Sequence, residues 1–187
     1  MQEPEPRSGC WGRVRSMLRE IIETVVLTAL IFIALRFAFQ NFRIEGQSME
    51  PNFHEGQFLI INKLEYRFHP PERGDVIVFH SPDNPQKDFI KRIIGLPGEQ
   101  IQIQDGRVLI HGQPLEEPYL TNPVSGNWGP ATVAPDQYFV LGDNRNNSSD
   151  SRNWGMLPMA KMIGKAWISY WPPPTWGLVP HHTYAFD

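Results

Sequence analysis

The chain has 187 residues and a net charge of −3, so its charge balance gives no general attraction to nucleic acid. It is long enough for one domain with its own core and appended segments. Its 18 prolines and 15 glycines interrupt short runs rich in Val, Ile, Phe and Tyr, which favours many short strands over a helix bundle. A single cysteine, Cys10, excludes an intrachain disulfide.

The first predicted elements are a polar tail over residues 1–19 and a transmembrane anchor over residues 20–40. The apolar run from 21 to 39 would span ~28 Å as a helix, close to the ~30 Å hydrocarbon core of a bilayer. Its two charges, Glu23 and Arg36, lie near its ends, where long side chains reach the headgroups. A buried core helix and a cleaved signal peptide are the alternatives, and no clean A-x-A site follows the run before Gln40.

The residues before the apolar run predict its orientation. Four of them are basic: Arg7, Arg13, Arg15 and Arg19. By the positive-inside tendency they indicate a cytoplasmic N-terminus, a single membrane pass, and residues 41–187 on the far side of the membrane.

Beyond the anchor the pattern predicts β-structure. Strands are expected over residues 58–68, 76–79, 88–95, 138–144 and 165–171. Asp105-Gly106 lies between two alternating runs and predicts a hairpin with a type I′ turn. The region 99–135 is expected to be this hairpin followed by an irregular, proline-rich loop, and residues 172–187 show no periodicity. The predicted fold class is therefore mainly β, an antiparallel β-barrel or sandwich behind one N-terminal transmembrane helix.

The predicted strand DFIKRIIG poses a problem. Side chains alternate along a strand, so Lys91 lies on one apolar face and Arg92 on the other. One cation can turn to solvent, but the other would lie among apolar neighbours, where burial of an ammonium is costly.

Two further stretches contain candidate reactive groups. RIEGQSMEPN places Ser48 directly after the anchor, and LGDNRNNSSDSRNWG is a dense polar loop after a hydrophobic strand. Alone, each is typical of a turn or surface loop. The second fails the pattern of a calcium-binding EF-hand, because Arg145 and Ser148 occupy positions that need a ligand and a glycine. Asn147 begins a formal glycosylation match, which is frequent by chance.

Four blocks follow one another behind the anchor: RIEGQSMEPN, RGDVIVF, DFIKRIIGLPGE and GDNRNNSSDSRNWG. In these blocks the chain resembles the type I signal peptidase family (leader peptidase, peptidase family S26). The resemblance runs from the anchor to about Trp171 and is closest to short cyanobacterial, chloroplast or Gram-positive members. It implies a membrane-bound serine endopeptidase that removes signal peptides from secreted preproteins after small residues, with no cofactor and no metal. The implied partners are preprotein signal peptides, the bilayer of a cell or thylakoid membrane and, transiently, the protein translocation machinery.

The resemblance implies that Ser48 is the nucleophile and Lys91 the general base. A serine hydroxyl is a poor nucleophile until a base takes its proton, and an ordinary lysine is protonated at neutral pH. Burial penalises the charged amine and lowers its pKa, which gives a reason for an apolar setting around Lys91. Arg92 stays protonated, so it is expected to face outward or to pair with a carboxylate.

The resemblance also implies supporting residues. Ser148 would orient the Lys91 amine, and a charge network would hold the loop through Asp143, Arg145, Asp150 and Arg152. The Ser48 backbone N–H would be one oxyanion donor. Some relatives supply a second from a serine hydroxyl two residues before the nucleophile, where this chain has Gly46, which lacks a side chain.

Shallow apolar pockets for small substrate residues are expected from Ile44, Met49, Phe89 and Ile90, with core packing as the alternative for each. Aromatic and sulfur-containing side chains are expected at the bilayer surface, namely Met49, Phe53, Trp128, Trp154, Trp171 and Trp176. Packing within the domain is the alternative for the tryptophans.

Three other functions remain open. A self-cleaving repressor also uses serine and lysine, but it predicts a DNA-binding domain where this chain has an apolar run. A Ser-His-Asp hydrolase would use His54, His80 or His111, yet Gly46 to Glu50 lacks the second glycine of a nucleophile elbow. A non-catalytic, membrane-tethered β-domain leaves the pairing of Ser48 with Lys91 unexplained. Zinc is not expected, because there is one cysteine and no HExxH motif.

Overall fold

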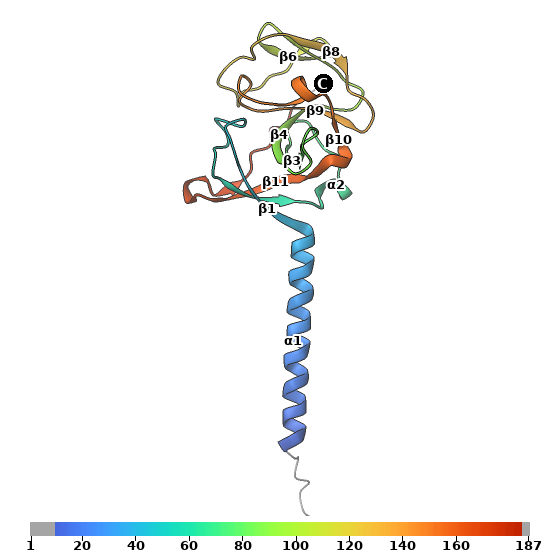
Figure 1. Cartoon of the computed structure of the whole chain (residues 1–187), viewed down its shortest axis with the longest axis vertical. Helices are drawn as coiled ribbons and strands as arrows, with labels where there is room; N and C mark the ends of the chain where they lie inside the picture. Colours follow the sequence, from blue (N-terminus) through green and yellow to red (C-terminus); the bar gives the residue numbers. More distant parts are fainter. Residues whose placement is uncertain (1–9, 185–187) are drawn as a thin grey trace, which may run out of the picture. The chain divides into compact units, whose positions relative to one another are not determined.

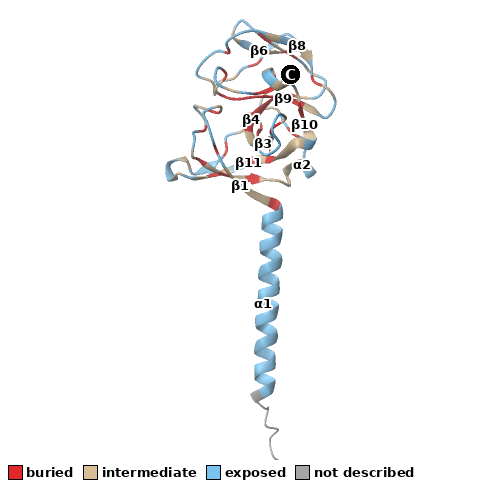
Figure 2. Ribbon diagram, viewed as in Figure 1, coloured by how far each residue is buried: buried red, intermediate tan, exposed pale blue. Residues whose placement is uncertain are grey.

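A computed structural model of the chain describes residues 10–184 (Figure 1). It divides into two compact units that meet in sequence between Ala38 and Phe39. The first is helix α1 (Cys10–Ala38). Residues Trp11–Ala38 are long and apolar enough to cross a membrane by length and composition, with a mean hydropathy of 2.2. Figure 2 shows the helix exposed over almost all of its described length.

The helix is longer than the predicted anchor at its N-terminal end and shorter at the other. Residues 10–19, which were expected in the tail, are helical, and Arg19 pairs with Glu23 one turn later at 2.7 Å. Phe39 and Gln40 belong instead to strand β1, where they pair with β2. Residues 1–9, including Arg7, lie outside the described residues.

The second unit is built from short strands. Their bounds are β1 (Phe39–Arg43), β2 (Phe58–Asn62), β3 (Val76–His80), β4 (Asp88–Gly95), β5 (Gln100–Gln104), β6 (Arg107–Ile110), β7 (Gln113–Pro114), β8 (Trp128–Thr132), β9 (Gln137–Leu141), β10 (Leu157–Pro158), β11 (Met162–Trp171) and β12 (Gly177–Leu178). Short helical turns lie between them: α2 (Glu65–Phe68), α3 (Ser151–Trp154), η1 (Met159–Lys161) and η2 (Pro173–Thr175).

The strands form two antiparallel sheets, which confirms the predicted fold class. The larger sheet has the order β1-β2-β11-β3-β4-β9-β10, with β12 also paired to β11, and the smaller has the order β7-β6-β5-β8. The predicted hairpin is confirmed: Gln104 pairs with Arg107, and Asp105 and Gly106 have φ values of 51° and 78°, as a type I′ turn requires.

Three apolar clusters form the core, and the buried residues gather in the strands (Figure 2). One cluster joins β1, β2, β3 and β11 and includes Ile44, Met49 and Phe53. A second joins β4 and β9 to the smaller sheet, so it holds the two sheets together. The third packs Phe79, Ile93 and Val140 on the larger sheet. Strand β4 contributes to all three clusters, which explains why both of its faces are apolar.

Several details differ from the predictions. The strand expected over 58–68 ends at Asn62, where the Asn62 amide donates to Glu65 and helix α2 follows. The irregular loop expected after the hairpin in the region 99–135 contains β7 and β8, and β8 pairs with β5. Met49 and Phe53 are 1% and 3% exposed, so neither reaches the surface. Trp128 and Trp154 pack on Phe139 and Phe79, whereas Trp171 and Trp176 are exposed.

Candidate active site

Ser48 lies in a turn that the core fixes in place. The next residue, Met49, is buried in the first apolar cluster, and its carbonyl accepts a hydrogen bond from Phe53 N at 3.0 Å. Gly46, two residues before the serine, has a φ of 80°, a backbone conformation that favours glycine. The turn therefore buries Met49 and leaves the half-buried Ser48 hydroxyl accessible.

Lys91 reaches Ser48 from the middle of β4. Its Nζ donates to Ser48 Oγ at 2.6 Å and to the Ile90 carbonyl at 2.8 Å. The residue is only 3% exposed, and Nζ lies 5.4 Å from the centroid of the Phe89 ring. Burial lowers the pKa of the Lys91 amine to about 8, because desolvation outweighs the opposing charges of Asp150 and Asp143.

The polar loop after β9 holds the main chain of the serine. Asn144 N donates to the Ser48 carbonyl at 3.0 Å, and Asn144 Nδ2 donates to the Gln47 carbonyl at 3.0 Å. A Cβ at Gly142 would lie 2.4 Å from the Ser48 carbonyl oxygen, so the loop comes this close only because residue 142 is glycine. Three distant stretches of the chain thus meet at Ser48.

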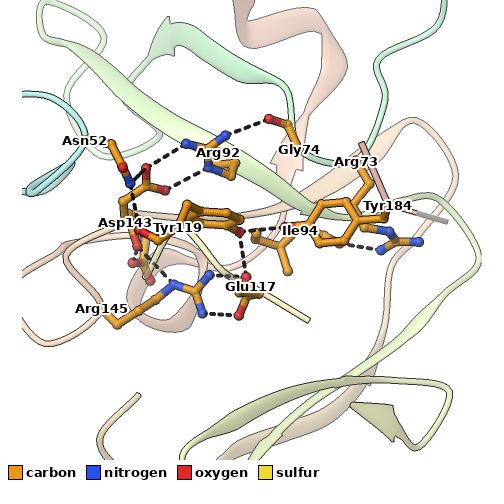
Figure 3. A network of polar contacts seen from close by, with 12 residues as sticks. Asn52, Arg73, Gly74, Arg92, Ile94, Glu117, Tyr119, Asp143, Arg145 and Tyr184 are labelled. Atoms are coloured by element: carbon orange, nitrogen blue, oxygen red, sulfur yellow. Dashed lines mark hydrogen bonds and ion pairs between the residues drawn. The ribbon is translucent and has the colours of Figure 1, made fainter. Parts of the chain in front are cut away.

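Arg92 is buried on the other side of the strand and pairs with a carboxylate (Figure 3). Its Nε and Nη2 donate to the two oxygens of Asp143 at 2.9 and 2.7 Å, and Nη1 donates to the Gly74 carbonyl at 2.9 Å. Its guanidinium carbon lies 4.3 Å from the centroid of the Tyr119 ring. Of the two expected outcomes for Arg92, pairing is correct and exposure is wrong, since the residue is 1% exposed.

The four predicted loop charges pair with different partners. Asp150 and Arg152 pair with each other at 2.8 Å, and Asp150 also caps helix α3 and accepts from Gly142 N at 3.1 Å. Arg145 instead makes a bidentate pair with Glu117, and Asp143 pairs with Arg92 (Figure 3). Ion pairs therefore connect the loop to β4 and to the segment after β7, and one further pair lies within the loop.

Ser148 makes no hydrogen bond to Lys91 in this structure. Its Oγ is buried and has no hydrogen-bond partner among the described residues. A Cβ at Gly142 would lie 2.3 Å from this Oγ, which places Ser148 against the same stretch of loop that contacts Ser48. Its orienting role stays a prediction.

A cleft of about 780 Å³ opens beside Ser48 and Lys91. Phe89 and Ile90 line it, and their contact with small substrate residues stays a prediction, whereas Ile44 and Met49 are each 1% exposed and pack in the core. Exposed polar residues complete the walls, including Glu45, Glu55, Lys87, Asn147 and Ser149. A chain of substrate thus has open access to the Ser48 hydroxyl.

Sequence reasoning missed several residues of the site. Asn144 was part of the quoted loop, but nothing in the pattern distinguished it from its polar neighbours. Glu117 and Tyr119 carried no signal, because they lie in a stretch interpreted as an irregular loop. Asn52 ends the RIEGQSMEPN block, but the pattern gave it no role. Of the histidines weighed as bases, His80 pairs with Asp88 at 2.8 Å, and the hydrogen-bond partner of Ser48 Oγ is Lys91.

Comparison with known proteins finds similar sequences and a similar structure. A family model described as "Signal peptidase, peptidase S26" matches residues 17–171. Signal peptidase I of Leptolyngbya laminosa is 46% identical over 165 residues, which cover 84% of this chain and 81% of that protein. Signal peptidase I of Bacillus caldolyticus is 39% identical over 150 residues, covering 73% and 81%. A crystal structure of a signal peptidase I from Enterococcus faecalis aligns with 52% of this chain and 97% of that chain, with 35% identity and a TM-score of 0.47.

Proposed function

Because the chain belongs to the signal peptidase family, peptidase S26, we propose that it removes signal peptides from preproteins with Ser48 as nucleophile and Lys91 as general base. The resemblance drawn from the sequence blocks, including the likeness to cyanobacterial and Bacillus enzymes, is confirmed. The observation that carries the assignment of the two residues is the 2.6 Å separation of Lys91 Nζ and Ser48 Oγ beside an open cleft.

The proposed cycle has two halves. Ser48 Oγ attacks the scissile carbonyl while the neutral Lys91 amine takes its proton, and Lys91 then returns the proton to the leaving amine. A water molecule, deprotonated by the same amine, attacks the acyl-enzyme and releases the signal peptide with Ser48 reprotonated. The pKa of Lys91 of about 8 supports this cycle, because an appreciable fraction of the amine is neutral at pH 7.

Charge on the tetrahedral intermediate requires fixed donors. The Ser48 backbone N–H is the proposed first donor. Asn144 holds it in place, since Asn144 Nδ2 donates to the Gln47 carbonyl of the same peptide unit and Asn144 N donates to the Ser48 carbonyl of the next. Gly46 supplies no side-chain donor.

The cleft supports a preference for small residues before the cleaved bond. Phe89 and Ile90 are apolar walls close to Lys91, and bulky side chains would meet them. The substrate is proposed to bind as an extended strand, a mode in which main-chain hydrogen bonds give affinity and pockets give specificity.

The N-terminal apolar helix anchors the chain in a membrane. We further propose that the N-terminus is cytoplasmic and the β-domain extracytoplasmic, in the cell or thylakoid membrane, where it meets preproteins leaving the translocation machinery. The basic residues Arg13, Arg15 and Arg19, together with Arg7, support this orientation.

Cleavage of a preprotein by the detergent-solubilised chain tests the assignment. Ser48→Ala and Lys91→Arg are expected to abolish cleavage, because alanine has no nucleophile and arginine cannot become neutral. Ser125→Ala and Lys161→Arg are the matched controls and should cleave at the wild-type rate. Processing that survives in Lys91→Arg would eliminate the neutral amine as base. An inactive wild-type chain would favour the non-catalytic β-domain.

A further inference from the structure

Residues 179–184, called here the C-terminal segment, follow β12 and lie beyond residue 171, where the family match ends. They are nevertheless packed into the domain. Val179 N donates to the Trp167 carbonyl at 2.9 Å, and the Val179 side chain is 4% exposed in the first apolar cluster. Tyr184, at the other end, packs against the second cluster. The segment therefore contacts two of the three apolar clusters.

The His181 side chain bridges β3 and β11 at a position where the two strands make no direct backbone pairing. The ladder between these strands ends at the pair of Ile77 and Lys165. One residue further, Val76 N donates to His181 Nδ1 at 3.2 Å, and His181 Nε2 donates to the Ala166 carbonyl at 2.9 Å. Val76 and Ala166 are both fully buried, so without the imidazole two main-chain groups would lose their partners.

The segment also contributes to the surroundings of Arg92. In the register of β3 with β4, Val76 lies opposite Arg92, and Arg92 Nη1 donates to the Pro180 carbonyl at 3.4 Å. Gly74, whose carbonyl accepts from the same nitrogen, meets the segment directly: a Cβ at residue 74 would lie 1.7 Å from the His182 carbonyl oxygen. The glycine of the RGDVIVF block thus admits the segment next to the buried cation.

A third contact reaches the aromatic ring beneath Arg92 (Figure 3). The hydroxyls of Tyr184 and Tyr119 are 2.6 Å apart, and the Tyr119 ring lies under the guanidinium. Asn52 Nδ2 donates to the Tyr119 carbonyl at 3.2 Å and to Asp143 Oδ2 at 2.8 Å. Arg92 is therefore bounded by Asp143 on one side and by groups that the C-terminal segment holds on the other.

We propose that the C-terminal segment is a positioning element for the catalytic dyad. By holding Arg92 against Asp143, it fixes the loop whose Asn144 binds the Ser48 carbonyl, and it fixes the strand that carries Lys91. The proposal rests on the dyad of the proposed function, and it assigns a role to Gly74 of the RGDVIVF block and to residues 179–184. His181 and Tyr184 are positioning residues, since neither touches the reacting atoms.

The test compares His181→Ala with His181→Gln in the full-length chain, with His69→Ala as a matched control at an exposed histidine. Preprotein cleavage is followed as kcat and KM between pH 5.5 and 10, beside the melting temperature of each variant. His181→Ala is expected to lower kcat at least tenfold with KM within twofold. The acid limb of the pH profile should also move to higher pH. When Asp143 is less fully paired with Arg92, its negative charge stabilises the protonated Lys91 amine and raises the pKa of Lys91. His181→Gln, whose amide can accept and donate, should recover most of kcat and restore the limb.

The results that overturn the proposal are equally specific. A folded His181→Ala variant with a lower melting temperature but wild-type kcat and pH profile would show that the segment only packs. A glutamine variant as impaired as the alanine variant would reject the bridging role. If His181→Ala does not fold, Tyr184→Phe decides, with a smaller fall in kcat in support and unchanged kinetics against. Failure of the dyad itself would appear separately, as cleavage by Ser48→Ala.

Discussion

The Lys91 amine donates to the Ser48 hydroxyl at 2.6 Å, although 43 positions separate the two residues. Each residue is held by its own surroundings. Lys91 lies in the interior of β4, between β3 and β9, and Ser48 precedes a methionine buried in the core. The pair is therefore preorganised, and a substrate does not have to assemble it.

The first prediction concerns the pH dependence of cleavage. The pKa of Lys91 is lowered to about 8 by burial, and only the neutral amine accepts the proton of Ser48. We expect kcat/KM to rise about tenfold per pH unit below this value and to level off above it. Initial rates on a preprotein between pH 5.5 and 10 check this. A limb centred near 6.5 would instead indicate a histidine base.

The second prediction concerns stability. The pKa of Lys91 is about 8 in the folded chain, against 10.5 for the free side chain, so between these values the unfolded state binds more protons and stability rises with pH. Below pH 8 the folded state bears the full free-energy cost of burying the charged Lys91 amine, which is about 3 kcal/mol as an upper bound at 1.36 kcal/mol per pKa unit. Lys91→Met removes this term while keeping the side-chain volume.

The free energy of unfolding should therefore change in favour of the wild type, relative to Lys91→Met, by up to about 3 kcal/mol as pH rises from 7.5 to 10.5. Denaturant unfolding of both chains, followed by tryptophan fluorescence at several pH values, measures the difference. A difference that stays constant over this window would mean that Lys91 is not buried as a cation at low pH.

The third prediction concerns the pair of Arg92 and Asp143. Both side chains are almost fully buried, so removing one partner leaves an uncompensated charge. Asp143→Ala is expected to lower the free energy of unfolding by about 3–5 kcal/mol. The double variant Arg92→Met/Asp143→Leu should cost less than the two single changes together. Asp88→Asn, in the more exposed pair with His80, is the control and should cost about 1 kcal/mol or less.

The fourth prediction separates activity from stability at Ser148. Its Oγ is buried without a hydrogen-bond partner among the described residues, a situation that costs free energy in the folded state. Ser148→Ala should therefore leave the melting temperature unchanged or raise it. If the hydroxyl orients the Lys91 amine during the reaction, kcat should fall by an order of magnitude or more. Wild-type kcat in a stable Ser148→Ala variant would remove Ser148 from the site.

Local patterns were sufficient for part of the fold. The long apolar run, the Asp-Gly turn and the alternating strands on either side of it were all predicted, because each depends on neighbouring residues only. The bounds of α1 and the presence of β8 were not. Strand β8 has the sequence WGPAT, with no alternation, and it is a strand because β5 offers it a partner.

The reactive residue types, their order along the chain and the need for a dry setting around Lys91 can all be read from the amino-acid sequence. The contacts between distant groups became visible in the folded chain: Arg92 with Asp143, Arg145 with Glu117, Asn144 with Ser48, and His181 with the end of the β3–β11 ladder. The reason is physical. Periodicity and turn preference act between residues a few positions apart, whereas the partner of a buried charge is set by the packing of segments that are distant along the chain.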